Sequence, residues 1–180
     1  MKANGLIIRD AVETDAVAVA AIYAEHVHAG TASFDTVPRS AQDTAAKIAE
    51  CAERGWPFIV GECAGVVVGY AYATQFRDRA AYTYSCENSI YINAELRGQG
   101  IGKALLTHLL SAAEQSGFRQ IIAVIGGGEP PSVGLHSSLG FQHAGRMQSV
   151  GRKFGEWLDT VYMQRALGKG DRTPPPVEPK

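Results

Sequence analysis

The sequence lacks an excess of charge of either sign. Its 17 Lys and Arg residues are balanced by 18 Asp and Glu residues, which gives a formal net charge of −1. Proteins that bind nucleic acids non-specifically need clustered Lys and Arg side chains to replace the counterions of the phosphates. The composition therefore argues against a nucleic-acid partner and favours a small-molecule one.

Long hydrophobic runs are also missing. No stretch reaches the roughly 18 consecutive apolar residues that indicate a membrane-spanning helix. The first residues, MKANGLIIRDA, lack the apolar core of a signal peptide. We expect a cytoplasmic protein that does not contact the membrane.

Cysteine is scarce as well. The three cysteines, Cys51, Cys63 and Cys86, form neither a CxxC pair nor a cluster with metal-ligand spacing. Their odd number does not suggest a disulfide framework. We therefore expect reduced thiols, no bound metal and no cysteine nucleophile.

The length and the apolar content are those of one globular domain. Of the 180 residues, 46% are hydrophobic, which is enough for a substantial core. We assign this domain to residues 1–167. Residues 168–180, GKGDRTPPPVEPK, are rich in proline and poor in apolar residues, so we expect a disordered tail.

Residue patterns along the domain predict a mixed α/β fold. Alternating or continuous apolar runs predict strands. Two helices are predicted from apolar residues at helical spacing, and the other two from cap and stop residues: Ser40 and Asp43 with Gly55, and Pro130 and Pro131 with Gly140. The predicted strands are 6–9, 57–63, 66–76, 87–93, 120–125, 142–150 and 158–164, and the predicted helices are 15–27, 40–54, 101–116 and 132–139. The resulting order of elements is βααβββαβαββ.

The most distinctive stretch is the turn before the third helix, Arg97-Gly98-Gln99-Gly100-Ile101-Gly102. Glycines occur where a backbone approaches a ligand closely or takes dihedral angles that other residues resist. The amides of such a turn and the free N–H groups of the following helix favour an anion, most simply a phosphate. The guanidinium of Arg97 adds a positive charge beside them.

Two common phosphate-binding loops do not fit this turn. A dinucleotide fingerprint, GxGxxG, that begins at Gly98 would need glycine at position 103, where the chain has Lys103. A Walker A loop that ends at Lys103 would need glycine at 97 and Ser or Thr at 104. The chain has Arg97 and Ala104 there.

The turn does match the R/Q-x-x-G-x-G/A signature of the GNAT superfamily of N-acetyltransferases. The predicted order of elements resembles the GNAT fold, in which a mixed sheet of about seven strands is flanked by about four helices. From about residue 6 to 166, the chain resembles the branch that acetylates phosphinothricin and methionine sulfoximine. This resemblance is carried by 33–36 (SFDT), 82–91, 123–126 (AVIG), 132–136 (SVGLH), 139–141 (LGF) and 151–159 (GRKFGEWLD).

The resemblance implies an enzyme that transfers an acetyl group from acetyl-CoA directly to the α-amine of a small amino acid analogue. The residues implied to bind the coenzyme pyrophosphate are Arg97, Gly98, Gln99, Gly100, Ile101 and Gly102. The backbone of Ser89, Ile90 and Tyr91 would lie along the pantetheine and the acetyl group. A bulge in this strand would aim a main-chain N–H at the oxyanion. In one departure from the family, Glu129 replaces an Asn that usually contacts pantetheine.

Two catalytic residues are implied by the resemblance. An amine must lose a proton to attack a thioester, and Glu87 matches the general base of the family. His136 matches the position from which the leaving thiolate is protonated, where many members have Tyr. The residues alone leave alternatives open, because Glu87 could pair with Arg77 or Arg79, and His136 could be a packed helix residue.

The acceptor pocket is expected around two loops. Arg77 and Arg79 match basic positions of the branch, and a guanidinium can hold a substrate carboxylate in a two-pronged geometry. Phe34 and Tyr82 would flank the acceptor. From the residues alone, Phe34 could instead plug the core, and both arginines could lie in solvent.

Two other functions stay open from the sequence. The enzyme could acetylate a different amine, such as an amino acid amide, a polyamine or a peptide N-terminus. Alternatively, the chain could be a sensor that binds acyl-CoA without catalysis. Related enzymes often form homodimers, so we expect a homodimer, with Phe154 and Trp157 either at its interface or in the core.

Overall fold

The computed structural model describes residues 5–179, so the ends of the predicted domain and tail, 1–4 and 180, lie outside the described residues. The strands are β1 Ile7–Asp10, β2 Phe58–Cys63, β3 Val66–Gln75, β4 Ser85–Ile92, β5 Gln120–Gly126, β6 Gln142–Lys153 and β7 Glu156–Ala166. The helices are α1 Ala16–Ala29, α2 Ala41–Glu53, α3 Ile101–Gln115 and α4 Pro130–Ser138. The fold class and the order of these elements predicted from the sequence are confirmed. No helix within the described range is long and apolar enough to cross a membrane.

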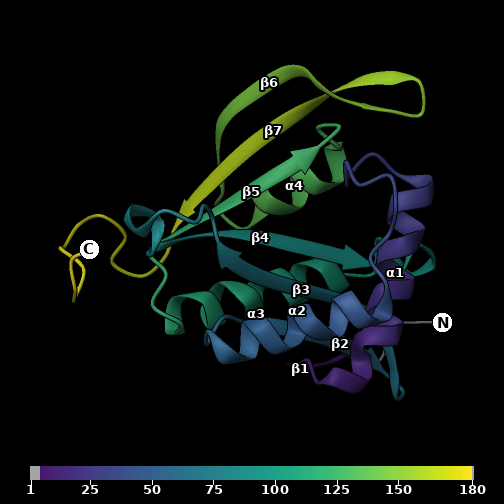
Figure 1. Ribbon diagram of the computed structural model, residues 1–180, viewed down its shortest axis with the longest axis horizontal. Coiled ribbons are helices and arrows are strands. Elements are labelled where there is room, and N and C mark those ends of the chain that lie inside the picture. Colours follow the sequence, from purple (N-terminus) through teal and green to yellow (C-terminus); the bar gives the residue numbers. More distant parts are fainter. Residues whose placement is uncertain (1–4, 180) are drawn as a thin grey trace.

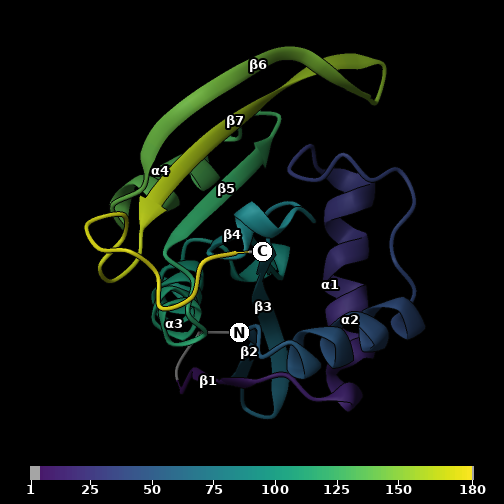
Figure 2. The same ribbon diagram turned by 60° about the vertical axis from the view of Figure 1, so that its left-hand side comes forward.

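The seven strands form one sheet in the order β1-β2-β3-β4-β5-β7-β6. Neighbouring strands are antiparallel except β4 and β5, which are parallel and are connected through α3. The β6–β7 hairpin arches away from the rest of the sheet (Figure 1). Figure 2 shows α1 and α2 on one side of the sheet and α3 and α4 on the other.

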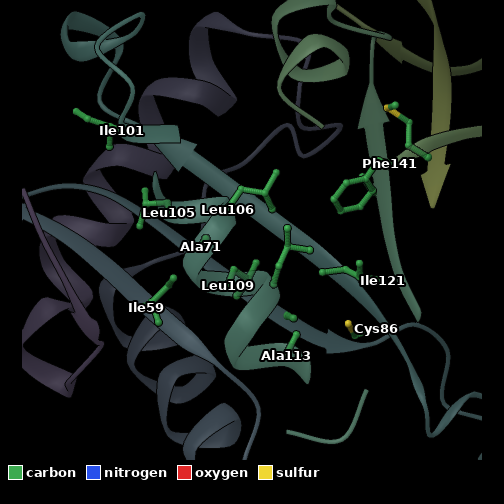
Figure 3. Packing of buried hydrophobic residues seen from close by; sticks show 14 of the residues in the cluster. Ile59, Ala71, Cys86, Ile101, Leu105, Leu106, Leu109, Ala113, Ile121 and Phe141 are labelled. Carbon is green, nitrogen blue, oxygen red and sulfur yellow. The ribbon is translucent and has the colours of Figure 1, made fainter. Parts of the chain in front are cut away.

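Each face of the sheet buries its own hydrophobic cluster. On one face, Leu105, Leu106 and Leu109 of α3 are fully buried against side chains of the strands (Figure 3). Burying one such side chain contributes about 1.5–3 kcal/mol. The other cluster joins α1 and α2 to aromatic residues of β2, β3 and β4. Because α3 is fixed on the sheet in this way, the turn that precedes it is fixed as well.

The loop between α1 and α2, residues 30–39, is held against the sheet. Lys153 of β6 donates from Nζ to the carbonyl oxygens of Gly30 and Ser33, each at 2.9 Å. After the loop, α2 begins with a capping box. Asp43 N donates to Ser40 Oγ at 3.1 Å, and Ser40 N donates to Asp43 Oδ2 at 3.2 Å.

The parallel strands β4 and β5 separate halfway along their length. They pair from Ser85–Gln120 to Asn88–Ala123. Beyond that point β4 continues to pair with β3, and β5 with β7. The β3–β4 ladder, which lies wholly within the described residues, has no register shift, so the bulge expected in this strand is not found in that ladder. Instead, the divergence of the two strands frees main-chain groups of β4 at the gap.

The segment 168–179 has neither helix nor strand, yet it contacts the domain. Tyr84 Oη donates to the carbonyl oxygen of Val177 at 2.6 Å, and Arg119 Nη2 donates to that of Pro174 at 3.0 Å. Both donors lie next to the N-terminal ends of β4 and β5. The disorder expected for this segment stays a prediction.

Candidate active site

The glycine turn between β4 and α3 has the conformation of an anion-binding loop. Gly98 and Gly100 have φ angles of +75° and +86°, which glycine adopts without the steric penalty of other residues. Gly102 packs closely instead, because a Cβ there would lie 2.8 Å from Cδ1 of Ile92 and would displace that side chain. Gly100 is the N-cap of α3 and makes no side-chain cap, so the first N–H groups of the helix are available to a ligand.

Arg97 is oriented by His26 of α1, a residue that the sequence analysis did not identify. His26 Nε2 donates to the carbonyl oxygen of Ile92 at 2.9 Å, so Nδ1 carries the lone pair and accepts from Arg97 Nη2 at 3.3 Å. Burial lowers the pKa of His26, which keeps the ring neutral and able to accept. No motif or spacing connects these two residues in the sequence.

A groove made of two adjoining pockets follows the gap between β4 and β5. The part that we call the turn pocket has a volume of about 380 Å³ and includes the glycine turn, Arg97 and the start of α4. The part that we call the inner pocket has a volume of about 350 Å³ and includes the loop 30–39, β3 and the point where the strands separate. The residues that line both parts are Ala32, Ile90, Tyr91 and Ser132.

The residues predicted to bind the coenzyme are distributed along this groove. Those that line one or both pockets are Ser89, Ile90, Tyr91, Arg97, Gly98, Gly100 and Gly102. Gln99 and Ile101 line neither pocket, and the Ile101 side chain is buried in the core. Ile101 is nevertheless the first residue of α3, where helix N–H groups have no partner within the helix.

Glu129 lines the turn pocket directly before α4. Its Oε1 accepts a hydrogen bond from Thr31 Oγ1 at 3.1 Å, which joins α4 to the loop 30–39. A carboxylate accepts hydrogen bonds but cannot donate them, whereas the amide of Asn does both. Thus a ligand in the turn pocket meets an acceptor here and no donor.

Glu87 lies in the inner pocket, one residue before the last paired position of β4 and β5. It stands opposite Thr74 of β3, so both side chains lie on the same face of the sheet. Burial raises the pKa of Glu87, although Arg77, whose Nη1 is 3.6 Å from Glu87 Oε2, lowers it. The side chain of Arg77 is 50% exposed, so this ion pair is weak. Glu87 therefore both lies in the pocket and pairs with Arg77, although the sequence had presented these as alternatives.

His136 is buried on α4 and is hydrogen-bonded through both ring nitrogens. Nδ1 donates to the carbonyl oxygen of Ser132 at 2.8 Å, so Nε2 accepts from Asn88 Nδ2 at 3.0 Å. Burial lowers the pKa of His136, in agreement with a neutral ring.

Asn88 is a second site residue that the sequence analysis missed. Both Asn88 and His136 line the inner pocket. Asn88 is only 6% exposed, and among the described residues its Oδ1 is the one buried side-chain polar atom without a hydrogen-bond partner. Turning the amide over would place Oδ1 against the lone pair of His136 Nε2, so the neutral ring fixes its orientation. The position directly after Glu87 was the only available signal in the sequence.

Phe34 serves both of the uses that the sequence left open. Its ring lies between two glycines: a Cβ at Gly126 would be 2.9 Å from Cε1, and a Cβ at Gly151 would overlap the ring. The side chain also lines the inner pocket. It therefore packs on β5 and β6 and forms a wall of the pocket.

The other residues predicted for the acceptor lie outside the inner pocket. Arg77 contacts Glu87 without lining the pocket, and neither Arg79 nor Tyr82 belongs to the lining. Tyr82 packs edge-on against Phe76, with ring centroids 5.8 Å apart. The guanidinium that does line the inner pocket belongs to Arg39, which the sequence analysis did not identify.

The titratable residues of the groove do not form a metal site. Within residues 5–179, no group of three or more His, Cys, Asp or Glu side chains is arranged to hold a metal ion. The groove thus offers an anion site at one end and a partly desolvated carboxylate at the other. This arrangement suits a phosphorylated carrier whose reactive end reaches Glu87.

Known proteins share both the sequence and this architecture. The model of the acetyltransferase (GNAT) domain matches residues 8–162. A phosphinothricin N-acetyltransferase of Alcaligenes faecalis is 46% identical over 170 residues, which cover 94% of this chain and 85% of that protein. An L-methionine sulfoximine/L-methionine sulfone acetyltransferase of Pseudomonas aeruginosa is 37% identical over 161 residues, which cover 89% of this chain and 94% of that protein.

Solved structures agree with these sequence matches. A GNAT superfamily phosphinothricin acetyltransferase from Sinorhizobium meliloti, solved in complex with acetyl-CoA, has a TM-score of 0.92 and 46% identity, over 94% of this chain and 92% of that one. The acetyltransferase yncA from Salmonella typhimurium, also solved with acetyl-CoA, has a TM-score of 0.92 and 32% identity, over 97% of this chain and all of that one (100%).

Proposed function

The chain belongs to the GNAT family of acetyltransferases, and we propose that its acceptor is the α-amine of a small amino acid analogue of the phosphinothricin or methionine sulfoximine type. It is an acetyl-CoA-dependent N-acetyltransferase. The observation that carries the proposal is the pair of adjoining pockets, one at the glycine turn and the other at the carboxylate of Glu87. The activities of the two relatives from Alcaligenes faecalis and Pseudomonas aeruginosa supply the class of acceptor.

The turn pocket is the proposed site of the coenzyme. The pyrophosphate would bind the turn and the start of α3, at Arg97, Gly98, Gln99, Gly100, Ile101 and Gly102. Free helix N–H groups, the dipole of α3 and the guanidinium of Arg97 all favour its negative charge. The pantetheine and the acetyl group would follow the backbone of Ser89, Ile90 and Tyr91, where β4 no longer pairs with β5.

Glu87 is the proposed general base. An α-ammonium group loses two protons during the reaction, while its nitrogen forms a bond to the acetyl carbon and the carbon–sulfur bond breaks. Glu87 takes the first proton, directly or through water, and thus creates the neutral nucleophile. A raised pKa suits this role, because burial makes the carboxylate a better proton acceptor than a solvated one.

His136 is proposed to carry the second proton to the thiolate of coenzyme A. In the resting geometry, Nε2 holds a lone pair that accepts from Asn88. The ring must therefore receive a proton at Nε2 before it can donate one. Its lowered pKa favours the release of that proton to the thiolate. No covalent acetyl-enzyme is part of this scheme.

The acceptor is proposed to occupy the inner pocket. Phe34 would form one wall, since its exposed face lines this pocket. Arg77 is close enough to Glu87 to meet an acceptor at the rim. We retain Arg79 and Tyr82 as outer contacts of the acceptor, on the loop that follows Arg77.

We also propose a cytoplasmic homodimer whose catalytic domain spans residues 1–167. The cytoplasmic location is supported by three buried, unpaired cysteines. The dimer is supported by exposed apolar side chains on the β6–β7 hairpin, which extends from the domain in Figure 1; they are Met147, Val150, Phe154 and Trp157. Sedimentation at two protein concentrations tests the dimer, and a monomer at both would contradict it.

An acceptor panel tests the proposed function. Release of the coenzyme A thiol is measured with phosphinothricin, methionine sulfoximine, an amino acid amide, a polyamine and a peptide. We expect saturable turnover with the first two and little with the others. Preference for one of the other amines would refute the proposed acceptor. Binding of acetyl-CoA without turnover of any amine would indicate a sensor and refute the enzyme.

A further inference from the structure

The inner pocket contains a basic side chain that none of the proposed roles uses. Among the described residues that line this pocket, Arg39 is the only Arg or Lys. It lies at the end of the loop 30–39, directly before the cap of α2 at Ser40. An acceptor that carries an anionic group needs a cation within the pocket, and Arg77 lies outside the lining.

Two tyrosines hold the guanidinium of Arg39 in place. Its Nη1 donates to Tyr72 Oη at 3.2 Å, and its Cζ lies 5.0 Å from the centroid of the Tyr23 ring. Tyr72 stands two residues before Thr74, which is opposite Glu87 in the β3–β4 ladder. Side chains two residues apart on a strand share a face, so Tyr72 places Arg39 on the same face as Glu87.

In the described part of the chain, Arg39 has no carboxylate partner at ion-pair distance, although the charges of Asp35 and Asp43 act on it from farther away. No Asp or Glu within residues 5–179 forms an ion pair with it. Asp35 lines the same pocket, but its Oδ2 accepts from Tyr23 Oη. A guanidinium has five N–H groups in a planar fork, and among the described residues Tyr72 is the only one that accepts a hydrogen bond from it. The remaining groups can hold two oxygens of one anion.

We infer that Arg39, positioned by Tyr72 and Tyr23, forms an anion subsite that binds an oxyanionic group of the acceptor while its amine faces Glu87. The inference rests on the proposed function. It gives Arg39 the role of binding the anionic group of the acceptor, which the sequence had assigned to Arg77 and Arg79. The anionic group bound at this subsite is a carboxylate or a phosphinate. Phosphinothricin carries both groups, and methionine sulfoximine carries only the carboxylate.

The test compares the variants Arg39→Gln, Arg39→Lys and Arg79→Gln with the wild type. In Arg39→Gln, we expect KM for the acceptor to rise about 10- to 100-fold, because a charge-assisted hydrogen bond is lost. KM for acetyl-CoA should change less than about threefold. The KM of Arg39→Lys for the acceptor should lie between those of the wild type and Arg39→Gln, since an ammonium keeps the charge but not the planar fork of N–H groups. If KM rises for both phosphinothricin and methionine sulfoximine, Arg39 binds the carboxylate. If KM rises for phosphinothricin alone, Arg39 binds the phosphinate.

Arg54→Gln is the matched control. Arg54 also lies over an aromatic ring, with its Cζ 4.8 Å from the centroid of Trp56, but it lines neither pocket of the groove. Its removal should leave KM for the acceptor unchanged. An equal effect of Arg54→Gln and Arg39→Gln, or a large effect of Arg79→Gln with none of Arg39→Gln, would overturn the anion subsite.

The same variants separate this inference from the proposed function. If the wild type acetylates the two analogues and Arg39→Gln does so with the same KM, the subsite is wrong and the function stands. If the wild type acetylates no amine, the function is wrong. In that case calorimetric titration of each analogue into the complex with coenzyme A decides on the subsite. Binding that Arg39→Gln weakens supports it, and absent or unchanged binding overturns it.

Discussion

Two glycine-to-alanine substitutions isolate the effect of backbone conformation in the glycine turn. Gly100 and Gly134 share one property: apart from its own chain neighbours and helix backbone, a Cβ added at either position would meet no atom within 4 Å. They differ in their backbone, because Gly100 has a φ of +86° and Gly134 lies within α4 without a positive φ. The same added methyl group therefore probes conformation in one case and helix propensity in the other.

The expected effects have opposite signs. An L-residue in the left-handed conformation costs about 1–2 kcal/mol, so Gly100→Ala should lower the free energy of unfolding by that amount. Gly134→Ala should raise it by about 0.5–1 kcal/mol, because alanine restricts the unfolded chain and favours the helix. In a domain of this size, 1 kcal/mol corresponds to a change in Tm of about 2–4 °C.

Urea denaturation of both variants and the wild type measures these differences. The slope of the unfolding free energy against urea should stay constant, so that shifts of the midpoint report stability alone. If Gly100→Ala is as stable as the wild type, the left-handed conformation at the start of α3 is wrong. If Gly134→Ala is destabilised as much as Gly100→Ala, then φ does not explain the difference between the two glycines.

Further predictions concern Glu87, Lys153 and Asn88. Burial raises the pKa of Glu87, so the acid limb of kcat/KM should lie at a higher pH than a solvated glutamate would give. Glu87→Gln should remove that limb and lower kcat by about 10²- to 10⁴-fold, and an unchanged pH profile would exclude Glu87 as the base. The pKa of this carboxyl is higher in the folded state than in the unfolded state. The free energy of unfolding should therefore decrease as the pH rises from the unfolded-state pKa through the folded-state pKa. Denaturation curves across that range should show this loss in the wild type and not in Glu87→Gln. Lys153→Met removes both hydrogen bonds to the loop 30–39 and should lower the unfolding free energy by about 1–3 kcal/mol; limited proteolysis should then cut the loop faster, and unchanged cleavage would contradict its role. Asn88→Asp places a carboxylate next to His136 Nε2 and should raise the pKa of that imidazole in an NMR titration, whereas an unchanged pKa would show that the two side chains do not face each other.

The fold and the turn were predictable because their signals are local. The spacing of apolar residues and the local cap and stop residues predicted each strand and α-helix, although the ends of these elements differ from the structure. Three short 3-10 helices, Glu13–Asp15, Ala80–Tyr82 and Ala94–Leu96, were not predicted. Likewise, the three glycines of the turn lie within six consecutive residues, from Arg97 to Gly102. A sequence reveals such features directly, since the residues that cooperate are neighbours in the chain.

The site was predictable only in part. Glu87 was identified by the resemblance and does lie in the groove. Arg79 and Tyr82 were identified in the same way, but the loop that carries them lies outside the inner pocket. A basic residue near the right strand in sequence need not face the pocket, because loop conformation decides where its side chain lies.

The sequence by itself therefore determined the family, the order of the elements and the position of the glycine turn. Only the tertiary structure decided which side chains meet across the groove. Arg39 reaches the inner pocket through Tyr72, His26 orients Arg97, and Asn88 faces His136. Each of these pairs joins residues more than 30 positions apart in the chain. Such contacts depend on how helices pack on the sheet and where β4 and β5 separate, and no periodicity or motif in one sequence records that geometry.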